Sequence, residues 1–204
     1  MQTPQPRVPT FFVMIDPSHG GTDQGALLGD KLLEKDVTLA FAKRLKAELE
    51  DRGISAHLVR DGDASVSLEQ RAEITNAQHA GIYLALHAGM PGQGVRIYTP
   101  VLVASSAPTG KFLPWEAAQS AYIARSRILA QAVADEIGKK DVRVMNLSAM
   151  LRPLNNITTP AIAVELAPDP NNIQDIDGQK FQTAVAAGVA AGVVQMRSQL
   201  EAQR

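Results

Sequence analysis

The sequence predicts a single α/β domain in which helices flank a mostly parallel, twisted sheet of about six strands. Short apolar runs alternate along the chain with longer segments whose apolar residues recur at helical spacing. No internal repeat, low-complexity tract or linker divides the 204 residues, and 45% of them are hydrophobic, which is enough for one sizeable core. Strands that alternate with helices favour a parallel sheet. We expect residues 1–10 to form a disordered tail and residues 11–204 to form the domain.

The first quarter of the chain predicts a strand, a loop and a helix. The apolar run 10–15 is ended by Asp16 and Pro17 and predicts a strand buried on both faces. After a loop that contains several glycines, residues 33–52 predict an amphipathic helix that ends before Gly53. Its apolar positions recur every four residues, at Val37, Phe41, Leu45 and Leu49.

The middle of the chain continues the alternation. Residues 54–59 predict a second strand. Ser67 and Gln70 have the spacing of a capping box, which predicts a helix from Ser67 to about His79. Two more strands are predicted after it, at 81–86 and 94–99.

The last part of the chain begins with an irregular segment. The long loop within 100–118 is rich in Ser, Pro, Gly and Thr, and it is expected to form either a flap over the strand ends or a surface loop. Amphipathic helices are predicted at 115–138 and at 181–200. A brief strand and a longer one are predicted between them, at 143–145 and 161–165.

The composition excludes several classes of function. Twenty basic and 21 acidic side chains give a formal net charge of -1, and no run of Lys and Arg suggests a nucleic acid or an anionic membrane as partner. No apolar stretch is long enough for a transmembrane segment. The chain has no cysteine, so a tightly held metal ion must be bound by His, Asp or Glu. Its glycines match neither a dinucleotide-binding motif nor a P-loop.

Four chemically active side chains are expected at one edge of the predicted sheet. His19 follows the first strand, His87 ends the third, and Glu165 ends the last, while Glu34 begins the helix after the loop of His19. Ligands of open α/β sheets bind beyond the carboxyl ends of the strands. Two imidazoles and a carboxylate are the ligands of many catalytic zinc sites, and a second carboxylate would then act as general base.

The spacing of these residues leaves a second interpretation open. Their long separations match no short zinc motif. His19 can equally be a turn residue, Glu34 a charge that suits the start of a helix, and Glu165 a carboxylate at a strand end. The two other histidines, His57 and His79, are interpreted as structural.

A series of motifs occurs in one order along nearly the whole chain. The first is IDPSHGGTDQGA at 15–26, and the others lie at 34–39, 60–63, 67–71, 76–77, 84–88, 94–98 and 160–166. Together they resemble the zinc-dependent N-acetylmuramoyl-L-alanine amidases of the type 3 family. The resemblance implies that His19, Glu34 and His87 hold one Zn²⁺ ion and that Glu165 is the catalytic carboxylate.

Members of this family cut the amide bond between N-acetylmuramic acid and the L-alanine of peptidoglycan stem peptides. The resemblance therefore implies peptidoglycan as the substrate and a location outside the cytoplasm, in the periplasm or at the cell wall. Residues 1–10 do not form a signal peptide, so this location implies a leader that is absent from the sequence. Some members carry a helix that blocks the site until an activator binds, which makes a protein activator a second partner to test.

The chain departs from the family pattern at three places. Ser18 stands where Gly is common, Gly89 stands where Asn or Asp is usual, and 166–172 replaces a different family stretch. The departures leave all four chemical groups in place. Two other functions remain alternatives: a non-catalytic cell-wall module with the amidase fold, and a zinc hydrolase of another amide. Four further matches are interpreted as mainly structural, namely Arg60, Asp61, Arg71 and Asn76.

Overall fold

The computed structural model describes residues 11–29, 31–89, 92, 94–102, 115–167, 169, 171 and 176–202. The expected tail at 1–10 lies outside these residues, and so does most of the loop within 100–118 that was expected to form a flap or a surface loop.

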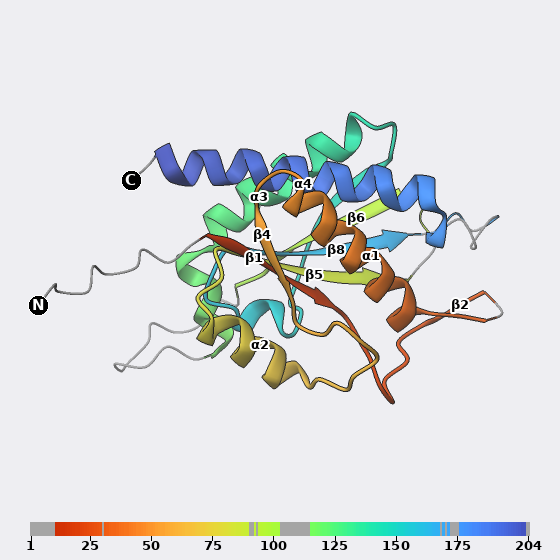
Figure 1. Ribbon diagram of the computed structural model, residues 1–204. Coiled ribbons are helices and arrows are strands. Elements are labelled where there is room, and N and C mark those ends of the chain that lie inside the picture. The colour runs from red at the N-terminus through yellow and green to blue at the C-terminus, as the bar shows by residue number, and fades with distance from the viewer. Residues whose placement is uncertain are drawn as a thin grey trace, which may run out of the picture.

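A twisted sheet of six strands forms the centre of the molecule (Figure 1). All neighbouring strands are parallel except β6 and β8, which are antiparallel, and this confirms the mostly parallel sheet. Because β6 runs antiparallel to β8, the first residues of β6 lie beside the last residues of β8. In spatial order the strands are β4 (Ser55–Leu58), β1 (Phe12–Pro17), β5 (Ile82–Ala88), β8 (Ala161–Ala167), β6 (Gly94–Pro100) and β7 (Val144–Ala149).

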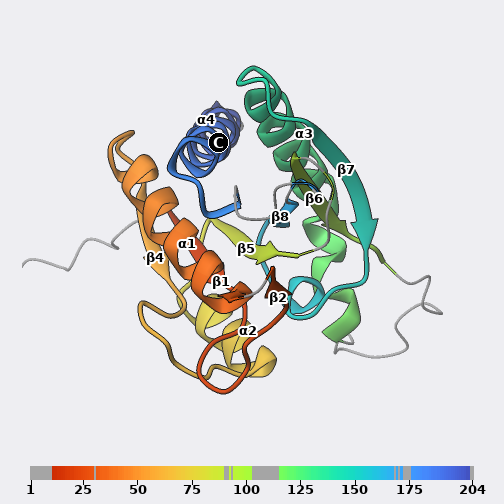
Figure 2. The ribbon, with the colours of Figure 1, turned by 90° about the vertical axis from the view of Figure 1, so that its right-hand side faces the viewer.

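Helices cover both faces of the sheet (Figure 2). On one face, α1 (Glu34–Glu50) packs on β1, β4 and β5, α3 (Ile123–Gly138) packs on β6, β7 and β8, and α4 (Gln179–Ala202) lies between α1 and α3. On the other face lie α2 (Leu68–Ala77) and the short 3₁₀ helix η2 (Leu154–Asn156). Each face therefore has its own buried apolar cluster.

Local sequence signals account for the two helices nearest the site. The four apolar residues predicted for the core face of α1 are each no more than 1% exposed. At the start of α2 the predicted capping box is present: Ser67 Oγ accepts from the Gln70 amide at 3.2 Å, and Gln70 Oε1 accepts from the Ser67 amide at 2.9 Å. These signals are local, so the sequence alone predicts both helices.

Some elements differ from the prediction. The helix expected at 115–138 is wrong in its first part, which forms the 3₁₀ helix η1 (Trp115–Ala121) before α3 begins. Buried Gln119 explains the difference, because its side-chain amide donates to the carbonyl oxygens of Ile157 and Thr159, far along the chain. The strand expected at 143–145 is longer, as β7. The hairpin of β2 (Leu27–Leu28) and β3 (Leu32–Leu33) was not predicted, since two-residue strands show no periodicity.

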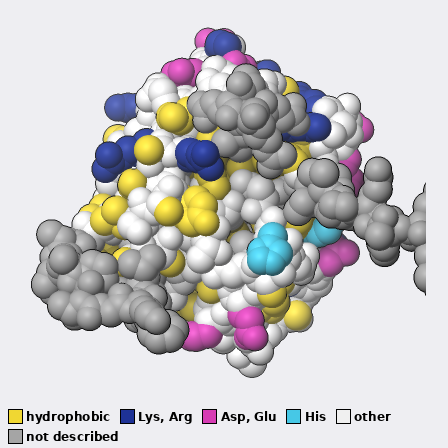
Figure 3. Space-filling model, turned by 90° about the vertical axis from the view of Figure 1, so that its left-hand side faces the viewer, with side chains coloured by type: hydrophobic (Ala, Val, Ile, Leu, Met, Phe, Trp, Pro, Cys, Tyr) yellow, Lys and Arg dark blue, Asp and Glu magenta, His cyan; other side chains and the backbone are white. Residues whose placement is uncertain are grey.

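Charged side chains of both signs are scattered among hydrophobic ones on the face opposite to that of Figure 2 (Figure 3). This mixture agrees with the formal net charge of -1. In the part of the chain that the structure describes, no helix is long and apolar enough to cross a membrane.

Candidate metal centre and catalytic carboxylate

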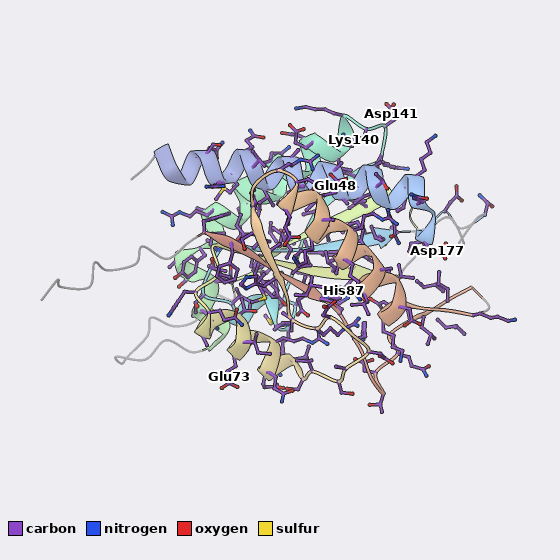
Figure 4. The ribbon with its side chains drawn as sticks, viewed as in Figure 1. Glu48, Glu73, His87, Lys140, Asp141 and Asp177 are labelled. Atoms are coloured by element: carbon purple, nitrogen blue, oxygen red, sulfur yellow. The ribbon has the colours of Figure 1, made fainter. Side chains whose placement is uncertain are left out.

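Three of the four predicted site residues come together at the carboxyl edge of the sheet. His19 lies two residues beyond β1, and Glu34 is the first residue of α1. His87, which is labelled in Figure 4, is the last residue but one of β5. One ligand atom of each residue lies within 4.8 Å of the ligand atoms of the other two. Among the described residues, this is the one group of three or more His, Asp or Glu side chains with such spacing.

The Glu34 carboxylate lies between the two imidazole rings. Its Oε2 is 3.1 Å from Nε2 of His19, and its Oε1 is 3.1 Å from Nδ1 of His87. The rings are edge to face, with centroids 5.8 Å apart. The ring nitrogens that face the carboxylate are therefore Nε2 in one histidine and Nδ1 in the other.

The outer nitrogen of each ring also has a partner. Nδ1 of His19 is 2.9 Å from Oδ2 of Asp23, and Nε2 of His87 is 2.9 Å from Oγ of Ser18. Histidines that bind metal ions in proteins usually have their second ring nitrogen held in this way. The donor set and its outer contacts fit a metal ion.

The loop that carries His19 has an unusual backbone. His19 has a φ of 64°, in the left-handed region, and Gly25 has a φ of 66°. A Cβ atom on Gly25 would lie 2.7 Å from both Glu34 Oε2 and His19 Cδ2, so only glycine fits beside the ligands.

Two buried arginines hold this loop to the rest of the domain. Arg71 donates to the carbonyl oxygens of Pro17 at 3.0 Å and His19 at 2.7 Å, and it forms an ion pair with buried Asp16. Arg60 donates to the carbonyl oxygens of Pro17 at 2.9 Å and Ser18 at 3.1 Å. Both side chains thus have the structural role that the sequence suggested for them.

The surroundings of Glu34 favour its charged form. Burial raises the pKa of its carboxyl, but hydrogen bonds with His19 and His87 and from the amides of Ala26 and Ala88 together hold this pKa far below its usual value. The hydrogen bond with Glu34 raises the pKa of His19, burial opposes the rise, and the contact with Asp23 adds to it. Glu34 is therefore an ionised carboxylate at neutral pH, as a metal ligand must be.

Glu165 lies beside this group but is not part of it. In the pairing of β5 with β8, Glu165 is opposite His87. Its Oε2 accepts a hydrogen bond from the Tyr98 hydroxyl at 2.7 Å, and its Oε1 is 3.4 Å from the Arg96 guanidinium. Burial, together with the hydrogen bond and charge of Glu165, raises the pKa of Tyr98 to about 12, so Tyr98 is a neutral donor at physiological pH.

Gly89 leaves room for this carboxylate. A Cβ atom on Gly89 would lie 3.1 Å from Oε1 of Glu165. A side chain at position 89 would therefore crowd the Glu165 carboxylate.

A hollow of about 400 Å³ contains both histidines of the group. Its wall also includes Ser65, Arg152 and Pro153. A second hollow, of about 620 Å³, lies at the start of α4 and contains none of the four predicted residues. The smaller hollow is therefore the one that places a ligand next to the candidate metal centre.

The two remaining histidines lie elsewhere. His57 is stacked on Phe12, with ring centroids 4.5 Å apart, and its Nδ1 is 3.4 Å from Gln78 Oε1. His79 follows the end of α2 with a φ of 54°. Neither belongs to a metal-ligating group among the described residues.

Sequence reasoning assigned no role to Ser18, Asp23 or Tyr98. A signal was available for Asp23, which lies four residues after His19 in a glycine-rich turn. The contacts of Ser18 and Tyr98 depend on strand pairing, because each joins residues more than 60 positions apart. No local pattern predicts such contacts.

Comparison with protein families gives one match over most of the chain. A family model described as N-acetylmuramoyl-L-alanine amidase matches residues 13–195. Amidase AmiA of Salmonella typhimurium is 43% identical over 77 residues, which cover 38% of this chain and 27% of AmiA. The germination-specific N-acetylmuramoyl-L-alanine amidase of Bacillus subtilis is 26% identical over 209 residues, which cover 90% of this chain and 78% of that protein. The match thus spans about a quarter of AmiA but most of the Bacillus protein.

Solved structures of two amidases have a similar fold. The N-acetylmuramoyl-L-alanine amidase AmiC2 of Nostoc punctiforme superimposes with a TM-score of 0.73 at 26% identity, over 93% of this chain and 98% of that one. An N-acetylmuramoyl-L-alanine amidase of Clostridium difficile 630 gives a TM-score of 0.74 at 25% identity, over 94% and 98% of the two chains.

Proposed function

The chain belongs to the N-acetylmuramoyl-L-alanine amidase family, and from this premise we propose that it hydrolyses the amide bond between N-acetylmuramic acid and L-alanine in peptidoglycan stem peptides. The observation that carries the proposal is the group of His19, Glu34 and His87 with a separate carboxylate, Glu165, on the adjoining strand. The three-residue group and the separate Glu165 carboxylate match the two parts of a metal-assisted amide hydrolysis.

We propose that His19, Glu34 and His87 bind one Zn²⁺ ion. Two imidazole nitrogens and one carboxylate oxygen are a common ligand set of catalytic zinc, which keeps its fourth position open. When bound, zinc polarises the scissile carbonyl group and lowers the pKa of water at the site. The chain has no cysteine, so these ligands are consistent with its composition.

Glu165 is proposed as the general base and then the general acid. It takes a proton from the attacking water and passes it to the alanine nitrogen, which must be protonated to leave. Glu34 is not assigned this role, because it belongs to the group of proposed metal ligands with His19 and His87. Tyr98 and Arg96 hold the Glu165 carboxylate in position.

The test is the substitution Glu165→Gln, which keeps the shape of the side chain and removes its basicity. We expect the variant to retain zinc and to release stem peptide from purified sacculi at least about 100-fold more slowly, the range of general acid–base catalysis. The matched control is Glu73→Gln, an exposed carboxylate on α2 that points away from the sheet (Figure 4).

Two further measurements complete this test. A His87→Ala variant is expected to lose zinc as well as activity. Release of stem peptide by Glu165→Gln at the wild-type rate would refute the role of Glu165. Mass spectrometry of the digested muropeptides identifies the bond that is cut, so cleavage at any other amide would refute the substrate assignment.

Location and partners follow from the proposed substrate. Peptidoglycan lies outside the cytoplasmic membrane, so we propose that the protein acts in the periplasm or at the cell wall, with residues 11–204 as its catalytic domain. A solved structure with the same fold shows the CwlD amidase of Clostridioides difficile in complex with the GerS lipoprotein. A protein activator for this chain is therefore a proposal, tested by comparing sacculus digestion with and without envelope extract.

A further inference from the structure

The side chain of Ser18 makes a contact that glycine at this position cannot make. Its Oγ lies 2.9 Å from Nε2 of His87, on the side of the ring that faces away from Glu34. Ser18 is buried, with only 8% of its surface exposed. We propose that Ser18 is a positioning residue that fixes the His87 ring so that Nδ1 is the metal-binding nitrogen, an inference that rests on the proposed metal site.

The backbone of Ser18 is held on both sides, so its hydroxyl group has a defined position. The Ser18 amide donates to the carbonyl oxygen of Leu86 at 3.1 Å, which continues the pairing of β1 with β5. Its carbonyl oxygen accepts from Thr38 Oγ1 at 3.0 Å and from the Arg60 guanidinium at 3.1 Å. The sheet, α1 and Arg60 therefore hold the backbone that carries the Ser18 hydroxyl group.

A hydroxyl group suits His87 both with and without a metal ion. In the metal-free protein, Nδ1 of His87 is 3.1 Å from Glu34 Oε1, where its proton can be donated to the carboxylate, and Ser18 then donates to Nε2. A nitrogen that binds a metal ion carries no proton, so the single proton of the neutral ring must then be on Nε2. The Ser18 hydroxyl accepts that hydrogen bond, because a hydroxyl group can both donate and accept.

Asp23 supplies the equivalent contact for His19. Its carboxylate is 2.9 Å from Nδ1 of His19 and leaves Nε2 to face Glu34. The side chain of Asp23 is 66% exposed, whereas Ser18 is buried. The two histidines therefore present different nitrogens to the same place, and each one is fixed by its own outer partner. With glycine at position 18, none of the described residues would supply such a partner for Nε2 of His87.

The first test measures zinc affinity. Purified metal-free wild type, Ser18→Ala and Ser18→Gly compete for zinc with a chromophoric chelator. Loss of an outer partner of a metal ligand typically weakens metal binding about 10- to 100-fold, and we expect the Kd of both variants to rise by at least about 10-fold. The control is Ser65→Ala, which removes a hydroxyl from the same hollow without a contact to His87, and its Kd is expected to stay within about twofold of wild type.

The second test identifies the nitrogen that binds. In long-range ¹H–¹⁵N spectra of the zinc-loaded wild type, His87 should show a metal-bound Nδ1 and a protonated Nε2. In Ser18→Ala we expect broadened or mixed signals for this ring and unchanged signals for His19. Thermal unfolding of the metal-free variants checks that a change in affinity does not reflect a loss of folding.

Unchanged zinc affinity in both Ser18 variants would overturn the inference, and so would an equal loss in Ser65→Ala. A wild type that binds Nε2 of His87 to zinc, or binds no zinc, would also overturn it. Failure of the proposed function is a separate result: a wild type that binds zinc but releases no stem peptide would refute the amidase activity and leave the role of Ser18 intact.

Discussion

Arg71 provides the most direct test of how the site is held together. Arg71 is 3% exposed, and its guanidinium pairs with the carboxylate of Asp16, which is 1% exposed. It also donates to the carbonyl oxygens of Pro17, His19 and Val66, at 3.0, 2.7 and 3.0 Å. The substitution Arg71→Met keeps most of the length of the side chain but removes all these donors.

The expected loss of stability follows from the charge that stays behind. In Arg71→Met the buried Asp16 carboxylate keeps the Tyr83 hydroxyl as a donor but loses its ion-pair partner. Removing one partner of a buried ion pair lowers the unfolding free energy by about 3–5 kcal/mol. For a chain of this size each kcal/mol lowers the Tm by about 2–4 °C, so the Tm should fall by about 6–20 °C.

A double variant separates the charge from the packing. In the double variant Asp16→Asn, Arg71→Met both charges of this ion pair are removed, and the Asn oxygen can still accept from Tyr83. We expect the double variant to recover more than half of the lost stability, since removal of both partners of a buried pair is often nearly neutral.

The assay is urea unfolding followed by circular dichroism, on the metal-free proteins. Arg127→Met, an exposed arginine on α3, is the control and should change the unfolding free energy by no more than about 0.5 kcal/mol. A loss below about 1 kcal/mol in Arg71→Met would refute the reasoning. A double variant less stable than the single one would refute it as well.

Two more predictions concern the two halves of the site. In Gly25→Ala the new methyl group would lie 2.7 Å from atoms of Glu34 and His19, so we expect zinc binding to be at least about 10-fold weaker by chelator competition. The control is Gly62→Ala, whose methyl group would have nothing within 4 Å and which should keep the wild-type affinity. Equal affinities of the two variants would contradict this prediction. Folding raises the pKa of Tyr98 from 10.0 to about 12, so the neutral hydroxyl group contributes to the stability of the folded state. This contribution is complete below pH 10 and is lost as the pH rises to about 12. Urea unfolding of wild type and Tyr98→Phe should therefore differ most below pH 10 and converge above it, and a difference that is constant with pH would count against the Tyr98 contact with Glu165.

The sequence predicts those parts of the fold that depend on neighbouring residues. The four apolar positions of α1 and the capping box of α2 are local patterns, and both elements lie where they were expected. The start of η1 was missed because buried Gln119 is held by carbonyl groups about 40 positions away. Tertiary hydrogen bonds of this kind leave no trace in hydrophobic periodicity.

The candidate site shows the same division. The rule that ligands bind at the carboxyl ends of strands was enough to place His19, Glu34 and His87 at one edge of the sheet. It could not show which ring nitrogen of each histidine faces Glu34, because this depends on Ser18 and Asp23. It also could not place Tyr98 next to Glu165, because the residues of β6 do not show whether this strand runs parallel or antiparallel to β8.

The antiparallel pairing of β6 with β8 separates the residues around Glu165 from the proposed metal ligands. The proposed metal ligands come from the loop after β1, from α1 and from β5, whereas Arg96 and Tyr98 reach Glu165 from β6. The two sets of residues adjoin where β5 pairs with β8, because His87 lies opposite Glu165 there. If the proposed roles hold, substitutions on β6 change proton transfer by Glu165 without replacing a proposed metal ligand, so turnover and metal affinity can be altered independently.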